Sequence, residues 1–167
     1  MVAGPKPIVS FALRLVTEAD EAFLFRLYGT TRAVEMDAAG FPDARREAFL
    51  QMQFNAQRVH YHKFYPAAKH LLVLVEERAA GRMWIDRSEP FIHLLDIAIL
   101  PEFRNLGLGA ALLNGLIAES EQSRLPIGVY VETNNPAQSF YRRLGFSLIK
   151  DEELYLYFER QPSGGRQ

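Results

Sequence analysis

The chain has 167 residues, of which 49% are hydrophobic, and its formal net charge is −1. This is enough apolar material for one buried core, so we predict a single domain over residues 1–160 and a disordered tail at 161–167. The near-neutral charge and the lack of an apolar run of about 18–20 residues argue against partners such as nucleic acid or a membrane. The absence of cysteine excludes disulfides, thiolate metal sites and a cysteine nucleophile, and it fits a cytoplasmic location.

Apolar periodicity and turn residues predict alternating helices and strands along the chain. Thr17-Glu18-Ala19-Asp20 resembles a capping box, with Asp in place of the usual Glu, ahead of a helix that reaches about Val34. Gly40-Phe41-Pro42-Asp43 then separates this helix from the next. We expect, in chain order, a strand at 8–16, helices at 17–34 and 44–62, a hairpin of strands 70–76 and 83–87 around Ala80-Gly81, a strand at 91–100, a helix at 107–124, a strand at 127–132, a short helix from Asn134 to Gly145, and strands at 146–150 and 154–159.

The segment Arg104-Asn105-Leu106-Gly107-Leu108-Gly109-Ala110 is the most informative part of the chain. It follows the apolar strand at 91–100 and opens a run with helical periodicity. The start of a helix has unpaired N–H groups and a positive dipole end, and glycine lets an anion approach the backbone closely. The sequence therefore predicts a binding site for a phosphate-bearing cofactor at this helix start.

Two common phosphate loops fit this segment poorly. A dinucleotide-binding loop would have a third glycine where the chain has Leu112. A nucleoside-triphosphate loop would have Gly-Lys-Ser/Thr, and no lysine occurs between Lys69 and Lys150. A nucleotide-binding domain is therefore disfavoured.

The pattern Arg-x-x-Gly-x-Gly over residues 104–109 resembles the pyrophosphate loop of the GNAT superfamily of N-acetyltransferases, which bind acetyl-CoA. A second segment, Asn134 to Phe146, resembles the later motif of the same family, Asn-x-x-Ala-x-x-(apolar)-Tyr-x-x-x-Gly-Phe. The resemblance covers about His93 to Phe158 and is only architectural before that. It implies a GNAT-like α/β fold with a mixed central sheet of six to seven strands and about four flanking helices.

The resemblance also implies which residues hold acetyl-CoA, the acyl donor, and it implies no metal. Asn105 stands where the family usually has glycine, but Asn tolerates left-handed backbone better than most residues. Asn134 is either a helix cap or a contact of the cofactor arm, or both. The expected cofactor-binding residues are Ile97, Ala98, Ile99, Arg104, Asn105, Leu106, Gly107, Leu108, Gly109, Ala110, Asn134 and Tyr141.

By the same resemblance, Tyr141 is the candidate acid that protonates the departing CoA thiolate. The alternative is a purely apolar contact of its ring with Phe140 and Phe146. A protonated amine must also lose a proton, and the sequence offers three candidate bases without choosing among them. These candidates are His93, Asp96 and Glu132.

The early helices and the hairpin are expected to form the acceptor pocket, around Arg32, Glu35, Met36 and Asp37 and around His60, Tyr61, His62, Phe64 and Tyr65. For the second group we favour a packing role. A metal site at His60 and His62 is disfavoured, because residues two apart do not share a helix face as metal ligands would.

The predicted function is N-acetyltransfer from acetyl-CoA to a primary amine, by direct attack in a ternary complex. The acceptor is a small molecule or a peptide, and a homodimer is compatible with this interpretation. The alternative function is a non-catalytic acyl-CoA-binding sensor.

Overall fold

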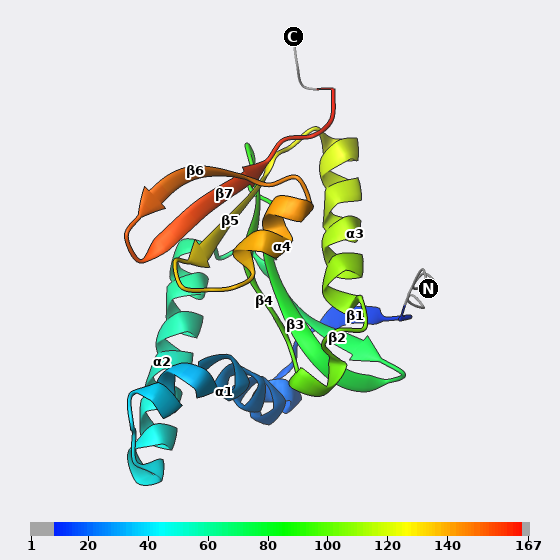
Figure 1. The fold of residues 1–167 in the computed structure, drawn as a ribbon. Coiled ribbons are helices and arrows are strands. Elements are labelled where there is room, and N and C mark those ends of the chain that lie inside the picture. The colour runs from blue at the N-terminus through cyan, green and yellow to red at the C-terminus, as the bar shows by residue number, and fades with distance from the viewer. Residues whose placement is uncertain (1–8, 165–167) are drawn as a thin grey trace, which may run out of the picture. The chain divides into compact units, whose positions relative to one another are not determined.

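The computed structural model describes residues 9–164, and within them seven strands form one mixed sheet (Figure 1). The strand order is β1-β2-β3-β4-β5-β7-β6. The β4–β5 pair is parallel, whereas the pairs β1–β2, β5–β7 and β6–β7 are antiparallel. The elements are β1 Ala12–Leu15, α1 Glu21–Ala38, α2 Asp43–Phe64, β2 Lys69–Val75, β3 Arg78–Asp86, β4 Ile92–Ile99, α3 Leu108–Ser123, β5 Ile127–Glu132, α4 Gln138–Arg143, β6 Ser147–Glu152 and β7 Tyr155–Arg160.

The predicted α/β class, with its mixed sheet and four helices, is confirmed. Most elements lie within a few residues of their expected positions, and β5 has the predicted bounds. The first strand is shorter than expected, and Ile8 lies outside the described residues. None of the helices at 9–164 is both long and apolar enough to cross a membrane.

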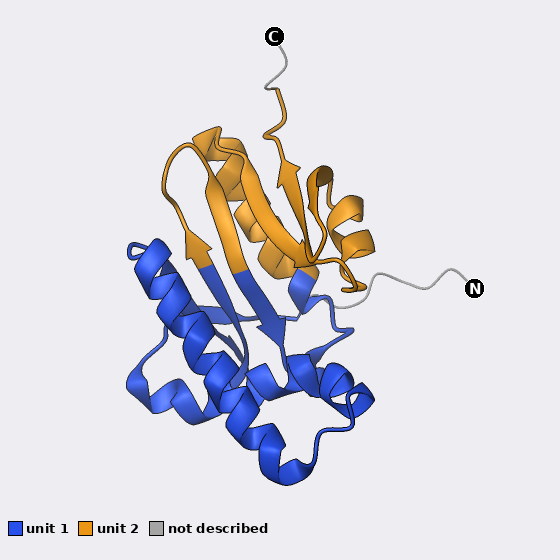
Figure 2. Cartoon of the chain, turned by 90° about the vertical axis from the view of Figure 1, so that its left-hand side faces the viewer, with its two compact units in different colours: residues 1–84, 96–109 blue, residues 85–95, 110–167 orange. Residues whose placement is uncertain are grey.

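Figure 2 colours two compact units of the chain. The first comprises residues 1–84 and 96–109, and the second comprises residues 85–95 and 110–167. Strands β3 and β4 and helix α3 each contribute residues to both units.

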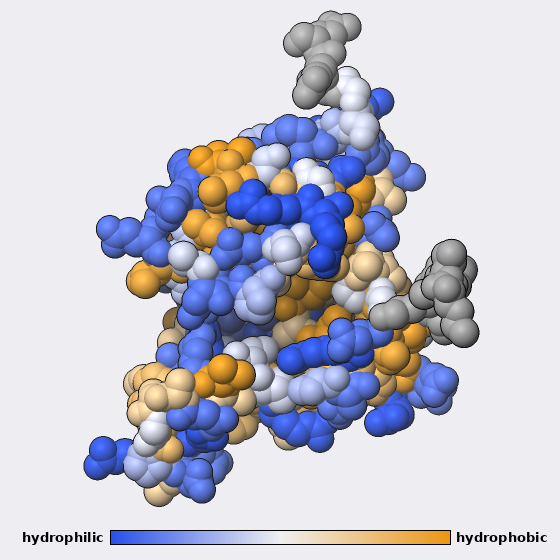
Figure 3. All heavy atoms as spheres, in the orientation of Figure 1, coloured by the Kyte–Doolittle hydropathy of each residue, from blue (hydrophilic) through white to orange (hydrophobic). Residues whose placement is uncertain are grey.

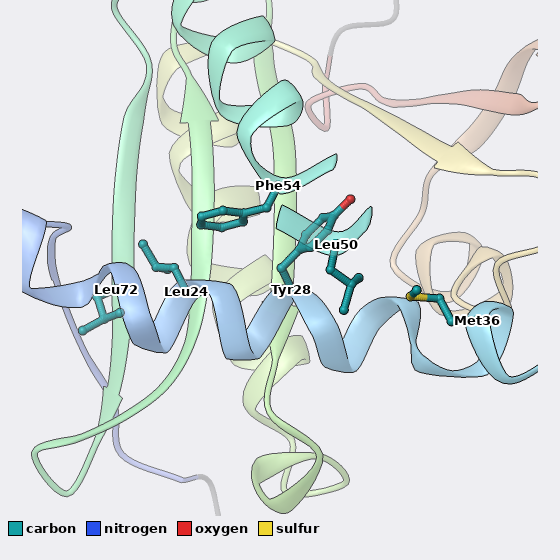
Figure 4. Packing of buried hydrophobic residues seen from close by; sticks show 6 residues of the cluster. All are labelled: Leu24, Tyr28, Met36, Leu50, Phe54 and Leu72. Atoms are coloured by element: carbon teal, nitrogen blue, oxygen red, sulfur yellow. The ribbon is translucent and has the colours of Figure 1, made fainter. Parts of the chain in front are cut away.

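The core of the first unit forms where α1 and α2 pack on β2 (Figure 4). Leu24 and Tyr28 of α1 point toward Phe54 of α2, and the rings of Tyr28 and Phe54 lie 5.7 Å apart. Leu72 of β2 is 1% exposed and belongs to the same cluster. Because these buried side chains come from three elements distant in sequence, their packing fixes both helices against the strand.

The capping box predicted at Thr17 is present, with Asp20 as its acidic member. The Asp20 carboxylate accepts a hydrogen bond of 2.8 Å from the Thr17 backbone N–H and also pairs with the Arg14 guanidinium at 2.7 Å. The hydrogen bond from Arg14 is the main reason that the pKa of Asp20 falls to about 2. A short 3-10 turn at Glu18–Asp20 leads into α1.

The β2–β3 hairpin turns earlier than we predicted. The connecting residues are Glu76 and Glu77, both with left-handed backbone (φ 50° and 65°), which suits the twist of a two-residue hairpin. Ala80 and Gly81, expected in the turn, lie inside β3 and are buried. The predicted turn at Ala80-Gly81 is wrong, because Gly81 is required for a close backbone contact within the sheet and not for a turn.

Gly81 lies so close to β4 that a side chain has no room. A Cβ at this position would be 2.3 Å from the carbonyl oxygen of Ala98. Replacement by alanine is therefore expected to destabilise the fold by about 1–3 kcal/mol, because the two strands must move apart. Urea unfolding of Gly81→Ala measures this, with Gly115→Ala as the control.

Gly115 lies in α3 with open space around the missing Cβ, so the control should be neutral or stabilising. An unchanged unfolding free energy for Gly81→Ala would show that β3 and β4 separate at no cost.

In the second unit, α3 buries an apolar stripe that includes Leu112, Leu113 and Leu116. Near the C-terminal end of α3, Glu121 accepts hydrogen bonds from Arg160 at 2.9 Å and from the Ser163 N–H at 2.7 Å. Ser163 belongs to the segment for which we expected disorder, and residues 165–167 of that segment lie outside the described residues.

Strand β6 forms one edge of the sheet and is exposed along its whole length. Its apolar residues Leu148 and Ile149 are exposed. Figure 3 shows hydrophobic patches among hydrophilic neighbours on one face of the molecule. The same strand carries Lys150, Asp151 and Glu152. Charged side chains of this kind discourage pairing of an edge strand with another chain.

Candidate active site

The predicted phosphate loop connects a 3-10 turn at Pro101–Phe103 with the start of α3 at Leu108. Asn105 has φ 61°, so the left-handed conformation that we expected it to tolerate is confirmed. Gly107 has φ 79°, and a Cβ at this position would meet nothing within 4 Å. The loop is therefore exposed and open at its glycine, at the helix end where backbone N–H groups attract anions.

Arg104 fixes this loop to the end of β4. Its Nε–H donates a hydrogen bond of 2.9 Å to the carbonyl oxygen of Ile99. Arg104 is exposed, and this is the one hydrogen bond of its guanidinium found within residues 9–164. It joins two members of the expected cofactor-binding set.

The backbone of β4 has one edge toward β3 and one edge away from it. The carbonyl of Ala98 is directed at Gly81, and the N–H of Leu100 donates to the carbonyl of Ala80 at 2.8 Å. The carbonyl oxygen of Ile99 is instead bound by the Nε–H of Arg104. The pairing of an extended ligand with the backbone of Ile97, Ala98 and Ile99 stays a prediction.

Asp96 stands just before this segment and contacts a buried arginine. The Nε–H of Arg82 donates to the Asp96 carboxylate at 2.6 Å, and an Nη2–H of Arg82 donates to the side-chain oxygen of Gln57 on α2 at 2.7 Å. The side chain of Arg82 is 3% exposed and that of Asp96 is 23% exposed. Sequence analysis missed Arg82 and Gln57, because neither belongs to a motif and only folding brings them to Asp96.

An aromatic cluster surrounds Trp84 in the same unit. The His70 ring stacks on Trp84 at 4.0 Å between centroids and 4° between planes. Tyr61 and His62 of α2 contact Trp84 edge-on, at 4.8 and 5.7 Å. These contacts agree with the packing role that we favoured for Tyr61. The same expectation does not hold for the whole group, because His60 and His62 are exposed and Phe64 is 59% exposed. A part of these residues in an acceptor pocket stays a prediction.

Burial lowers the pKa of His70 to about 3, and the nearby charge of Arg82 acts in the same direction. In the unfolded chain the imidazole binds a proton near pH 6.5. Between these pH values the unfolded chain binds the extra proton, so acidification from pH 6.5 toward 3 should destabilise the fold by up to about 1.4 kcal/mol per pH unit.

The variant His70→Phe keeps a ring on Trp84 but cannot titrate. Its unfolding free energy, measured in urea from pH 7 to pH 4, should fall less steeply than that of the wild type. Parallel curves for the two proteins would contradict a neutral His70 in the folded state.

The second unit holds the candidate acid. Tyr141 lies in α4 and is 5% exposed. Its ring meets Phe140 at 5.6 Å and Phe146 at 5.5 Å, as the packing alternative predicts. Its catalytic role stays a prediction.

Asn134 does not cap α4 as we expected. The N-cap residue is Ala137, and the side chain of Asn135 accepts a hydrogen bond of 2.9 Å from the Ala137 N–H. Residues 134–137 lie in the turn before the helix, which begins at Gln138. Its predicted end is confirmed, because Gly145 adopts φ 91° there.

The other two candidate bases also lie in the second unit. His93 is half-buried on β4, and burial lowers its pKa, although the charges of Asp86 and Glu159 oppose this. A neutral imidazole at pH 7 is able to accept a proton. Glu132 is the last residue of β5 and is half-exposed.

The structure therefore places the predicted residues in two groups. The first unit contains Asp96, the segment Ile97–Ile99 and the loop 104–109. The second contains Ala110 together with His93, Glu132, Asn134 and Tyr141. Within the first unit, the Arg104–Ile99 bond brings the loop to the strand.

Comparison with known proteins agrees with this geometry. The family described as Acetyltransferase (GNAT) family matches residues 32–146, well over half of the chain. The chain belongs to the GNAT acetyltransferase family. The match includes the loop at 104–110 and the segment from Asn134 to Phe146.

Individual relatives of this GNAT acetyltransferase are distant. An N-alpha-acetyltransferase of Sulfurisphaera tokodaii is 36% identical over 61 residues. The match covers 35% of this chain and 36% of the relative, so the chain spans about a third of the relative's length.

Solved structures share the fold of the GNAT chain over nearly its whole length. The PaiA N-acetyltransferase of Thermoplasma acidophilum, in complex with coenzyme A, has a TM-score of 0.70 and 16% identity, covering 91% of this chain and 99% of its own. The ribosomal-protein-S18-alanine N-acetyltransferase of Escherichia coli has a TM-score of 0.60 and 15% identity, covering 95% and 97%.

Proposed function

We propose that this GNAT acetyltransferase transfers the acetyl group of acetyl-CoA to a primary amine, by direct attack of the amine on the thioester. The observation that carries the proposal is the exposed loop with left-handed Asn105 and Gly107, fixed by Arg104 to β4 at the start of α3. Coenzyme A in the structure of the Thermoplasma relative supports the same donor for this chain.

The donor would lie along a continuous stretch of backbone. The N–H groups from Leu106 to Ala110 receive the pyrophosphate, where the α3 dipole favours negative charge. The pantetheine arm pairs with the backbone of Ile97, Ala98 and Ile99, as an extended ligand does with a strand edge. Asn134 is the further proposed contact of this arm.

The acceptor nitrogen loses two protons in the reaction, besides the bond exchange. The neutral amine nitrogen attacks the thioester carbonyl carbon, the C–N bond forms and the C–S bond breaks. One of His93, Asp96 or Glu132 accepts the first proton, which the ammonium loses before attack. The departing thiolate takes a proton from the Tyr141 hydroxyl, and the second proton, which the nitrogen loses on becoming an amide, restores that hydroxyl. No metal and no covalent enzyme intermediate take part.

The acceptor we put first is the free α-amino group of a peptide, because the relative from Sulfurisphaera is named an N-alpha-acetyltransferase. Small amines are the second acceptor class. Both present the same group to the enzyme, a primary ammonium that must be bound and then deprotonated.

The test is calorimetric titration with acetyl-CoA, followed by thiol release against three amines. These are a peptide with a free N-terminus, the same peptide N-acetylated and carrying one lysine, and 1,4-diaminobutane. Tight donor binding with amine-dependent thiol release is the expected result. Binding without release from any amine would favour the sensor, and failure to bind acetyl-CoA would refute the site.

A further inference from the structure

We propose that Arg82 positions Asp96 to bind the ammonium group of the acceptor amine. This inference rests on the proposed function and names the group that receives the second substrate. Arg82 does not touch the substrate in this arrangement, so it is a positioning residue. Asp96 is the contact.

Arg82 is held as a rigid part of the first unit. Its guanidinium, on β3, donates to Asp96 through Nε and to Gln57 of α2 through Nη2. The side chain is 3% exposed, and Trp84 of the same strand lies beneath it at 5.9 Å. A planar guanidinium fixed at two points leaves its carboxylate partner little freedom to rotate.

Only one of the two oxygens of the Asp96 carboxylate is bound by Arg82. Arg82 engages Oδ2, and among residues 9–164 no partner is found for Oδ1. The Asp96 side chain is 23% exposed, so that solvent reaches it from outside. The pair thus combines a buried cation with a partly exposed carboxylate, and such a carboxylate complements an ammonium group.

Asp96 lies on β4 toward the expected position of the donor's thioester end, where the amine attacks. The phosphate loop follows β4, and the proposed arm-binding residues Ile97–Ile99 come just before it on the strand. A pantetheine arm that starts at the loop and follows these residues therefore runs toward Asp96. Three residues of strand separate Ile99 from Asp96, which is about 10 Å. The thioester, at the far end of the arm, is where the amine must arrive.

The competing explanation is a structural ion pair. Buried pairs often contribute little net stability, but the loss of one partner is destabilising because it leaves a buried charge. A structural pair would affect unfolding but would leave discrimination between charged and uncharged ligands unchanged. Ligand discrimination therefore separates the two explanations.

The experiment titrates the CoA-bound protein with a lysine-free peptide that has a free N-terminus and with the N-acetylated form of that lysine-free peptide, which has no ammonium group. The wild type should prefer the free peptide by about 10- to 100-fold. This preference should disappear in Asp96→Asn and in Arg82→Gln, with CoA affinity unchanged. Arg82→Lys, which keeps the charge but not the two-point geometry, should recover part of it.

Arg87→Gln is the matched control, because Arg87 makes an exposed pair with Glu119 in the second unit. If Arg82→Gln does not fold, the double variant Arg82→Gln/Asp96→Asn removes both charges and should match Asp96→Asn. A wild type without the preference, or an Arg82→Gln protein that retains it, would overturn the proposal. The proposed function fails separately, through absent acetyl-CoA binding or absent thiol release.

Discussion

Replacement of Gly107 by aspartate should lower acetyl-CoA affinity by about 100-fold, or nearly 3 kcal/mol. The added carboxylate would stand in the open space beside the loop, where we place the pyrophosphate. There it would repel the phosphates and compete for the N–H groups at the start of α3. Calorimetric titration of Gly107→Asp with acetyl-CoA measures the loss.

The control for this variant is Gly107→Asn. Asn and Asp have nearly the same size, and both adopt left-handed backbone more readily than other side chains, as the φ of 79° requires. Asn should therefore cost only a few-fold in affinity. Equal losses for the two variants would mean that steric or backbone strain, rather than charge, governs binding at the loop.

Replacement of Tyr141 by phenylalanine should lower kcat by about 10²- to 10⁴-fold, the usual contribution of a general acid, with little change in acetyl-CoA affinity. The phenylalanine keeps the ring contacts with Phe140 and Phe146, so the loss would come from the hydroxyl. Steady-state thiol release gives kcat, and titration gives the affinity.

Tyr155→Phe serves as the control, because Tyr155 begins β7 and is 45% exposed. Its kcat should equal that of the wild type, and both variants should unfold near the wild-type temperature. Wild-type turnover by Tyr141→Phe would assign Tyr141 to packing alone.

Local signals in the sequence were sufficient for most of the fold. The capping box at Thr17 and the end of α4 at Gly145 are set by residues within one helical turn, and both predictions are confirmed. Gly81 was misread because its requirement comes from Ala98, on another strand. The cap expected at Asn134 failed for a different reason, since Asn135 binds the turn before the helix.

The sequence by itself determined the family and predicted the phosphate loop, because each motif is a short run of residues. Tertiary structure decided what surrounds Asp96. Its partner Arg82 is 14 residues away, and Gln57 is a further 25 residues from Arg82, on a helix. Such a contact depends on which strands pair and which helix covers them. The Arg82 guanidinium is buried, and a buried charge needs a partner such as Asp96. This burial cannot be read from the amino-acid sequence.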